Sequence, residues 1–268
     1  MQKTDPTYRW SEYQTGEIGE GSYSELILTS QKWRDIIWNH LLFVFKPASA
    51  RRDVDHALLF VGGDNWSDDL KRPTRRVGLP REAALFAVLD VLLQVPQQPM
   101  FNGRTEDQII ALTFSKYLNG DGNDWPLLLP MVKSAVRAMD AFQEFAKQEW
   151  SLKLKTFTVT DASKRGWTTW LTGAVDHRFT AIAPMVIDLP DMVRQVKHRL
   201  RAWGQLSPML SDYTQRDIHN LLVTKRGQEL RKLVDPISYR DLLKQPKLIV
   251  TATNDRYWPV DALNVCWD

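Results

Sequence analysis

The chain has 268 residues with a net charge of +3, and 43% of them are hydrophobic against 25% charged, which is ordinary for one large α/β domain or two small ones. The basic residues are spread along the chain, which excludes an extended nucleic-acid-binding surface, and the single cysteine, Cys266, excludes an intramolecular disulfide and a multi-cysteine metal site. No apolar run approaches the roughly 18 residues of a membrane span, and the first ten residues, MQKTDPTYRW, contain no apolar signal core.

Strands dominate the first hundred residues. A polar, glycine-rich stretch at 8–22 precedes three predicted strands, of which the second and third are continuous apolar runs typical of buried strands: Tyr23–Thr29, Leu41–Phe45 and Ala57–Val61. A polar loop follows, with a basic cluster at 72–81 that we interpret as solvated. The pattern then predicts a helix over Arg81–Leu93 and, because sheet edges tolerate proline, an edge strand over Val95–Met100.

Two glycines, Gly62 and Gly63, directly follow the strand Ala57–Val61. Glycines at this point let backbone N–H groups turn toward a neighbouring site, and in a sheet of this class the loop commonly supplies a donor to an oxyanion. A tight turn without a catalytic role explains the same residues, so both interpretations stay open.

The middle of the chain predicts a helix, strand, turn and helix in succession. Helices are expected at Glu106–Tyr117 and Trp125–Trp150, separated by an acidic turn whose spacing does not fit a calcium loop. The long helix leads into a strand at 154–159, a turn and a helix at Trp167–Val175, and another buried strand follows at Phe179–Ile187. This order is a right-handed crossover unit, so we predict a doubly wound, mostly parallel sheet.

Ser163 lies at the turn between the strand at 154–159 and the following helix. A serine on a sharp strand-to-helix turn projects its hydroxyl from the sheet edge, as the nucleophile of an α/β-hydrolase does. The usual motif, G-x-S-x-G, is imperfect here because Asp161 replaces the first glycine and the second glycine comes one residue late, at Gly166. A turn in which Asp161 or Ser163 only caps the helix is the alternative.

After residue 187 the strand pattern gives way to helices. Helices at Pro190–Trp203, Ser211–Leu222 and Gly227–Val234 predict a cap over the active-site edge, with the basic run 197–201 on a solvated helix face. A buried strand, Lys247–Ala252, and a polar loop follow. We therefore divide the chain into a first core part (1–187), a helical cap insertion (188–245), and a late core strand with its loop (246–268).

Asp255, in the loop after the late strand, stands where a triad acid would follow the serine. A solvated loop carboxylate is the alternative. The triad also needs a histidine to accept the serine proton, and none follows Asp255. Either the chain stops before that histidine, or the protein does not use a catalytic triad, or an earlier histidine takes the role. His177 and His219 are the candidates for that role. His40 is interpreted as a structural histidine.

Several stretches, taken together, resemble the PhoPQ-activated pathogenicity-related protein family, a set of α/β-hydrolase-like proteins. They are LTSQKW (28–33), WNHLLFVFKP (38–47), LLFVGGDN (58–65), WPLLLPMVKSAVRAMDAFQEF (125–145), SKRGWTTWLT (163–172) and PKLIVTATNDRYWPVDA (246–262). The resemblance implies an α/β-hydrolase type of fold with a helical cap. It also implies that the chain is truncated at its C-terminus, because the family continues beyond residue 268 into its histidine-bearing region.

Carried over by position, the resemblance implies Ser163 as nucleophile and Asp255 as triad acid, and it places Gly62 and Gly63 near the oxyanion; we add Lys164 as a backbone donor there. Asp161 departs from the family, which typically has glycine at that position. We predict a serine hydrolase-like domain for an ester or amide bond, weak or inactive as given because the triad histidine is missing. A non-catalytic signalling or binding protein on the same scaffold is the alternative.

The expected partner is a small-molecule or peptide substrate, and the alternative function adds a protein partner. No nucleic acid, membrane span, metal or organic cofactor is implied. The given chain carries no export signal, although members of the family are often exported.

Overall fold

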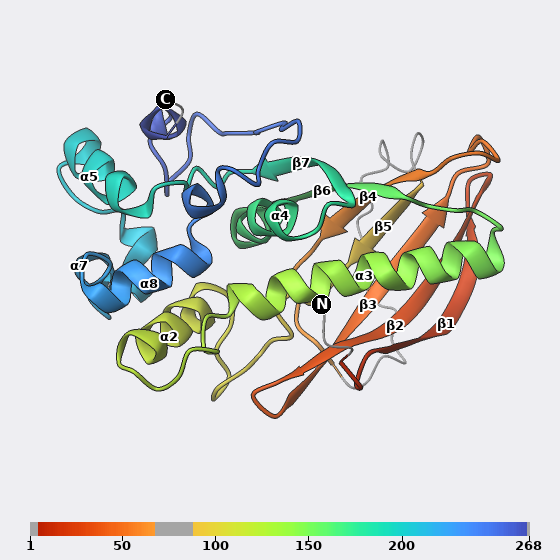
Figure 1. Cartoon of the computed structure of the whole chain (residues 1–268), viewed down its shortest axis with the longest axis horizontal. Helices are drawn as coiled ribbons and strands as arrows, with labels where there is room; N and C mark the ends of the chain where they lie inside the picture. Colours follow the sequence, from red (N-terminus) through yellow and green to blue (C-terminus); the bar gives the residue numbers. More distant parts are fainter. Residues whose placement is uncertain (1–4, 68–87, 267–268) are drawn as a thin grey trace.

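The computed structural model describes residues 5–67 and 88–266. Its centre is a seven-stranded sheet in the order β1-β2-β3-β5-β4-β6-β7 (Figure 1). The strands are β1 (Arg9–Ile18), β2 (Gly21–Trp33), β3 (Ile36–Lys46), β4 (His56–Val61), β5 (Leu89–Leu92), β6 (Thr156–Ala162) and β7 (Phe179–Met185). Pairing is antiparallel from β1 to β5 and parallel from β5 through β4 and β6 to β7.

A further extended segment, 246–250, continues the parallel side of the sheet beside β7. The Leu248 N–H donates to the Ile182 carbonyl over 3.0 Å, and the Val186 N–H donates to the Val250 carbonyl over 2.7 Å. The predicted strand Lys247–Ala252 is therefore present as two isolated bridges to β7. Its predicted burial is wrong, since Leu248 is 67% and Val250 39% exposed and no described segment pairs with the outer side.

Two long helices cover one face of the sheet. The described helices are α2 (Glu106–Leu118), α3 (Leu128–Glu149), α4 (Ser163–Val175), α5 (Met192–Trp203), α6 (Ser211–Thr214), α7 (Ile218–Leu221) and α8 (Lys225–Val234). α3 crosses in front of the sheet and α4 packs against β6 and β7 (Figure 1). Because alternate strand residues point to opposite faces, Leu42 and Val44 of β3 join the large core under these helices, whereas Phe43 and Phe45 form a separate cluster on the other face.

The α/β-hydrolase type of sheet expected from the sequence is confirmed, with three local differences. The helix predicted over Arg81–Leu93 is wrong at Leu89–Leu92, which form β5; residues 81–87, like the loop and basic cluster before them, lie outside the described residues. A short, continuously apolar run fits a buried strand as well as a helix, and pairing with both β3 and β4 decides for the strand.

The other two differences concern polar segments. Val95–Met100 is not a strand and forms only isolated bridges at Gln98 and Met100, because two prolines remove ladder donors. The polar stretch at 8–22 contains β1, an edge strand that is largely exposed and therefore lacks a buried apolar face.

The helices after β7 gather beyond the carboxyl ends of the parallel strands, where α6, α7 and α8 contact α2 (Figure 1). The predicted helices are confirmed for α5 and α8. The single helix predicted over Ser211–Leu222 is divided into α6 and α7, because Asp217 between them has a left-handed backbone with φ 55°.

Candidate active site

Ser163 is the first residue of α4 and follows directly on β6. Its φ of 55° lies in the left-handed region, which is strained for a residue with a Cβ atom. The helix starts at this strained turn, and the N–H groups of its first turn have no acceptor within the helix. The structure therefore has the sharp strand-to-helix turn that the sequence predicts at Ser163, which we call the elbow.

Gly166 explains why the second glycine of the motif comes one residue late. A Cβ atom at this position would lie 2.6 Å from Ile187 Cγ2 and 2.9 Å from the carbonyl oxygens of Asp161 and Met185. Only glycine lets the first turn of α4 approach the end of the sheet this closely. Asp161 itself remains within β6, paired with Pro184, so the aspartate does not prevent the turn.

The two residues after the serine tie the elbow to α2. Arg165 forms two hydrogen bonds to the Glu106 carboxylate, over 2.5 and 2.8 Å, and its Nε donates to the Val95 carbonyl over 2.6 Å. Lys164 Nζ lies 3.0 Å from Asp107 Oδ2. Burial alone would raise the pKa of Glu106, but the Arg165 bonds and charge lower it to about 2. The start of α4 is thereby held by paired charges.

Gly62 and Gly63 lie at the same edge of the sheet as Ser163, because β4 pairs in parallel with β6. The Gly62 N–H is already engaged, donating to the Leu92 carbonyl over 2.6 Å. A Cβ atom on Gly63 would lie 2.5 Å from Nη2 of Arg165. The glycine at position 63 therefore makes room for the Arg165 guanidinium, whether or not the loop also serves an oxyanion.

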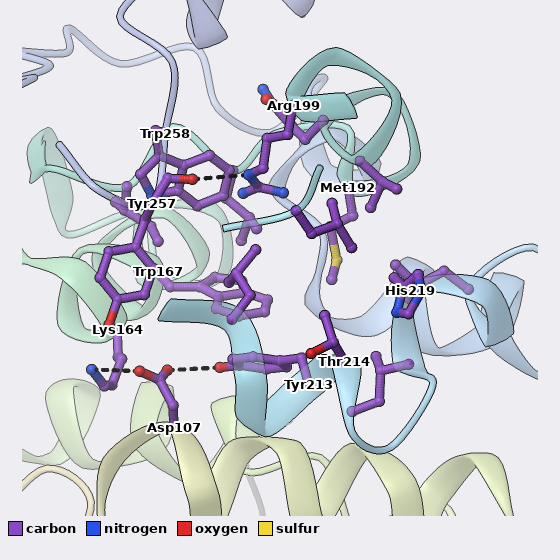
Figure 2. A pocket seen from close by; sticks show the side chains of 18 of the residues that line it. Asp107, Lys164, Trp167, Met192, Arg199, Tyr213, Thr214, His219, Tyr257 and Trp258 are labelled. Carbon is purple, nitrogen blue, oxygen red and sulfur yellow. Dashed lines mark hydrogen bonds and ion pairs between the residues drawn. The ribbon is translucent and has the colours of Figure 1, made fainter. Parts of the chain in front are cut away.

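A pocket opens between the elbow and the helices after β7 (Figure 2). Its cavity volume is about 100 Å³ and its wall is mostly apolar. Ser163 and Lys164 form part of the wall on the core side; the other lining residues include Trp167, Ile187, Leu189, Met192, Arg199, Tyr213, His219, Tyr257 and Trp258. The serine thus borders a small apolar cavity.

Asp255 lies in the loop after the 246–250 segment, where the sequence places it. Its Oδ1 accepts hydrogen bonds from the backbone N–H groups of Tyr257, over 2.6 Å, and Trp258, over 3.3 Å. A second carboxylate, Asp188 after β7, is close enough to sense this charge: burial first, and the Asp255 charge second, raise the pKa of Asp188 to about 6. Asp188 Oδ1 is buried without a hydrogen-bond partner.

Three of the five histidines are far from Ser163 or fully engaged. His177 follows the C-terminal end of the 13-residue helix α4, roughly 20 Å from its start. His56 pairs with Thr156 at the opposite end of β6. His40 is buried, donating from Nδ1 to the Leu93 carbonyl over 3.0 Å and accepting at Nε2 from Ser30, and burial lowers its pKa to about 4. The structural interpretation of His40 is confirmed.

The remaining two histidines belong to the helices after β7. His198 pairs with Asp261 over 2.8 Å and is not part of the pocket wall. His219 does line the pocket, and its Nδ1 is buried without a partner. Figure 2 shows it across the cavity from Lys164, and among the described residues no histidine hydrogen-bonds Ser163.

The sequence does not identify Arg199 as a pocket residue. The basic run 197–201 is expected on a solvated helix face, which is correct for Lys197 and Arg201 but wrong for Arg199, which is 5% exposed. With Met192 and Gln195 it forms the buried stripe of α5. The spacing of these three residues fits one face of a helix, but the sequence does not predict that a charged residue on that face is buried.

Two kinds of site are not found in the described residues. No group of three histidine, cysteine, aspartate or glutamate side chains among residues 5–67 and 88–266 is arranged to hold a metal ion. Within the same residues, no helix combines the length and apolar character needed to cross a membrane.

Comparisons with known proteins agree with this geometry. The sequence model of the PhoPQ-activated pathogenicity-related protein family matches residues 1–268. The autocrine proliferation repressor protein A of Dictyostelium discoideum is 32% identical over 278 residues, covering 98% of this chain and 55% of the relative. The chain therefore spans about half the length of the curated relative that it matches.

Solved structures with a similar fold include an esterase and a peptidase. A glucuronoyl esterase from Solibacter usitatus matches 98% of this chain and 72% of its own, with a TM-score of 0.54 and 13% identity. The acylaminoacyl peptidase of Pyrococcus horikoshii matches 97% of this chain and 34% of its own, with a TM-score of 0.53 and 12% identity. At these identities the likeness extends to the fold alone.

Proposed function

Because the chain belongs to the PhoPQ-activated pathogenicity-related protein family, we propose that it is a serine hydrolase-like domain acting on an ester or amide bond, with Ser163 as nucleophile. The observation that carries this proposal is the left-handed serine between β6 and α4, which borders an apolar pocket. A strained backbone at a nucleophile is a frequent feature of active sites.

In the proposed reaction, Ser163 Oγ attacks the carbonyl carbon of the substrate while a base accepts the hydroxyl proton. The N–H of Lys164, in the first turn of α4, has no acceptor within its own helix and faces the developing oxyanion. Of the loop 62–63, Gly63 is the proposed second donor, because the Gly62 N–H donates to the Leu92 carbonyl. The base then returns this proton to the leaving group, so that collapse of the tetrahedral intermediate releases an alcohol or amine and leaves an acyl-enzyme, which water hydrolyses to the acid and free serine.

Asp255 is the proposed triad acid, which would orient a histidine and stabilise its cation. We expect weak or no turnover by this chain, because His219 is the one histidine of the five that lines the pocket, and it stands across the cavity from the elbow. Residues 188–245 act in this proposal as the cap that closes the pocket. No metal or organic cofactor takes part.

A second candidate function is a binding or signalling protein that retains the hydrolase scaffold. It is favoured by the lack of a histidine contact to Ser163 among the described residues, and by the aspartate at position 161 where the family typically has glycine. In this case the pocket would bind a ligand or a protein partner's side chain without reaction.

Labelling with a fluorophosphonate probe separates the two functions. We expect the chain to be labelled slowly and faster as the pH rises, because no histidine among the described residues contacts Ser163 to activate it, and we expect Ser163→Ala to lose all label. Loss of label also in His219→Ala would identify the base. A chain that is folded by circular dichroism but unlabelled, even at high pH, would contradict the hydrolase proposal and favour the binding scaffold.

A further inference from the structure

Arg199 enters the pocket from α5 with its guanidinium group facing the cavity between Trp258 and Met192 (Figure 2). Its Nε donates to the Tyr257 carbonyl over 2.9 Å, and the guanidinium carbon lies 3.9 Å from the centre of the Trp258 ring. These two contacts fix its orientation. Its terminal nitrogens make no hydrogen bond to a described residue, although the residue is only 5% exposed.

The positive charge of Arg199 has no ion-pair partner among the described residues. Burial lowers the pKa of Arg199 to about 10, with the Asp255 charge opposing the shift, so the side chain remains charged near neutral pH. The Asp255 carboxylate acts on the charge of Arg199, and its Oδ1 accepts hydrogen bonds from the backbone of its own loop. A buried, unpaired guanidinium is costly unless an anion completes its hydrogen bonds.

The rest of the wall carries no other unbalanced cation. Lys164 is neutralised by Asp107, which also accepts from the Tyr213 hydroxyl over 2.8 Å. His219 stands on the far side, and the remaining lining is dominated by apolar side chains such as Trp167, Ile187, Leu189 and Leu206. The pocket therefore combines an apolar wall with one pair of unused guanidinium donors.

We propose that this pocket binds a small apolar molecule that carries a carboxylate, with the carboxylate held by the terminal nitrogens of Arg199. A planar guanidinium matches a carboxylate through two parallel hydrogen bonds. The cavity of about 100 Å³ is comparable to those that accept a single benzene ring, so an aromatic ring or a short branched chain fits the wall.

That the pocket binds such a molecule does not depend on the proposed function. That the molecule is a substrate does rest on the proposed function. In that role the carboxylate anchors at Arg199 while an ester or amide on the same molecule reaches Ser163, which borders the same cavity. Binding itself does not depend on an active serine, so the two proposals can fail separately.

Isothermal titration calorimetry with 3-phenylpropionate and its uncharged counterpart, 3-phenyl-1-propanol, tests the inference. We expect the acid to bind at least about tenfold more tightly than the alcohol, which is the effect of one charge-assisted hydrogen-bonded pair. Arg199→Met should remove this preference, Arg199→Lys should retain part of it, and Arg201→Met, on the exposed face of the same helix, should leave it unchanged.

Equal binding of acid and alcohol by the unaltered chain, or binding of neither, would overturn the inference without any variant. Retention of the preference in a folded Arg199→Met variant would do the same. If Arg199→Met does not fold, Arg199→Lys and the unaltered chain decide the result. Acid binding without fluorophosphonate labelling would support the carboxylate-binding pocket and count against the serine hydrolase. Labelling without acid binding would support the serine hydrolase and count against the carboxylate-binding pocket.

Discussion

Ser163 combines a reactive group with an unfavourable backbone, and the two can be separated by substitution. Alanine keeps the Cβ atom and therefore the left-handed strain, whereas glycine removes it. We expect Ser163→Gly to be more stable than Ser163→Ala by about 1 kcal/mol in urea unfolding. Equal stability of the two variants would mean that the turn is not strained.

Asp90, in β5, is fully buried and its carboxylate oxygens have no hydrogen-bond partner on another residue, and burial raises its pKa well above the usual value. A raised folded-state pKa favours the folded state below the unfolded pKa, and this stability is lost as pH rises toward the folded value. Asp90→Asn, which cannot ionise, should therefore gain stability relative to the parent at pH 8, by about 1 kcal/mol or more, and little at pH 4. A pH-independent difference in urea unfolding would contradict this.

The elbow helix is held by the bonds of Arg165 to α2 and to the Val95 carbonyl. Removing the guanidinium leaves the Glu106 carboxylate and the carbonyl without their donor. We expect Arg165→Met to cost about 3 kcal/mol in urea unfolding, and Glu106→Gln to cost less in the Arg165→Met background than in the parent. Lys155→Met, which breaks an exposed ion pair with Asp55, is the matched control and should cost less than about 1 kcal/mol. Equal costs for Arg165→Met and Lys155→Met would show that the bonds of Arg165 are not needed for stability.

Segment 246–250, beside β7, forms an edge of the sheet at which Leu248 and Val250 are exposed. An exposed apolar edge tends to pair with another chain. We expect sedimentation velocity to show association that increases with concentration, and Leu248→Lys to reduce it. Leu200→Lys, at an exposed apolar residue of α5, should leave association unchanged. An unaltered chain that stays monomeric at high concentration would contradict the prediction.

The sequence predicts β4 and β7 well because each is a short apolar run bounded by clear turns, at Ala57–Val61 and Phe179–Ile187. It fails at β5, where a strand and a helix share one apolar pattern and only pairing with two neighbours decides. At the site, the residues around Ser163 predict the sharp turn between β6 and α4 that the structure shows. Arg199 escapes prediction because its burial depends on Tyr257 and Trp258, which are distant in sequence and meet it only in the folded chain.

The left-handed backbone at Ser163 also bears on how such a chain would change over generations. A lineage with no use for the hydroxyl would gain stability from a single substitution to glycine, and random mutation supplies that substitution often. A serine that persists at this position therefore marks continuing selection for its side chain, whereas lineages that have abandoned the chemistry should accumulate glycine there.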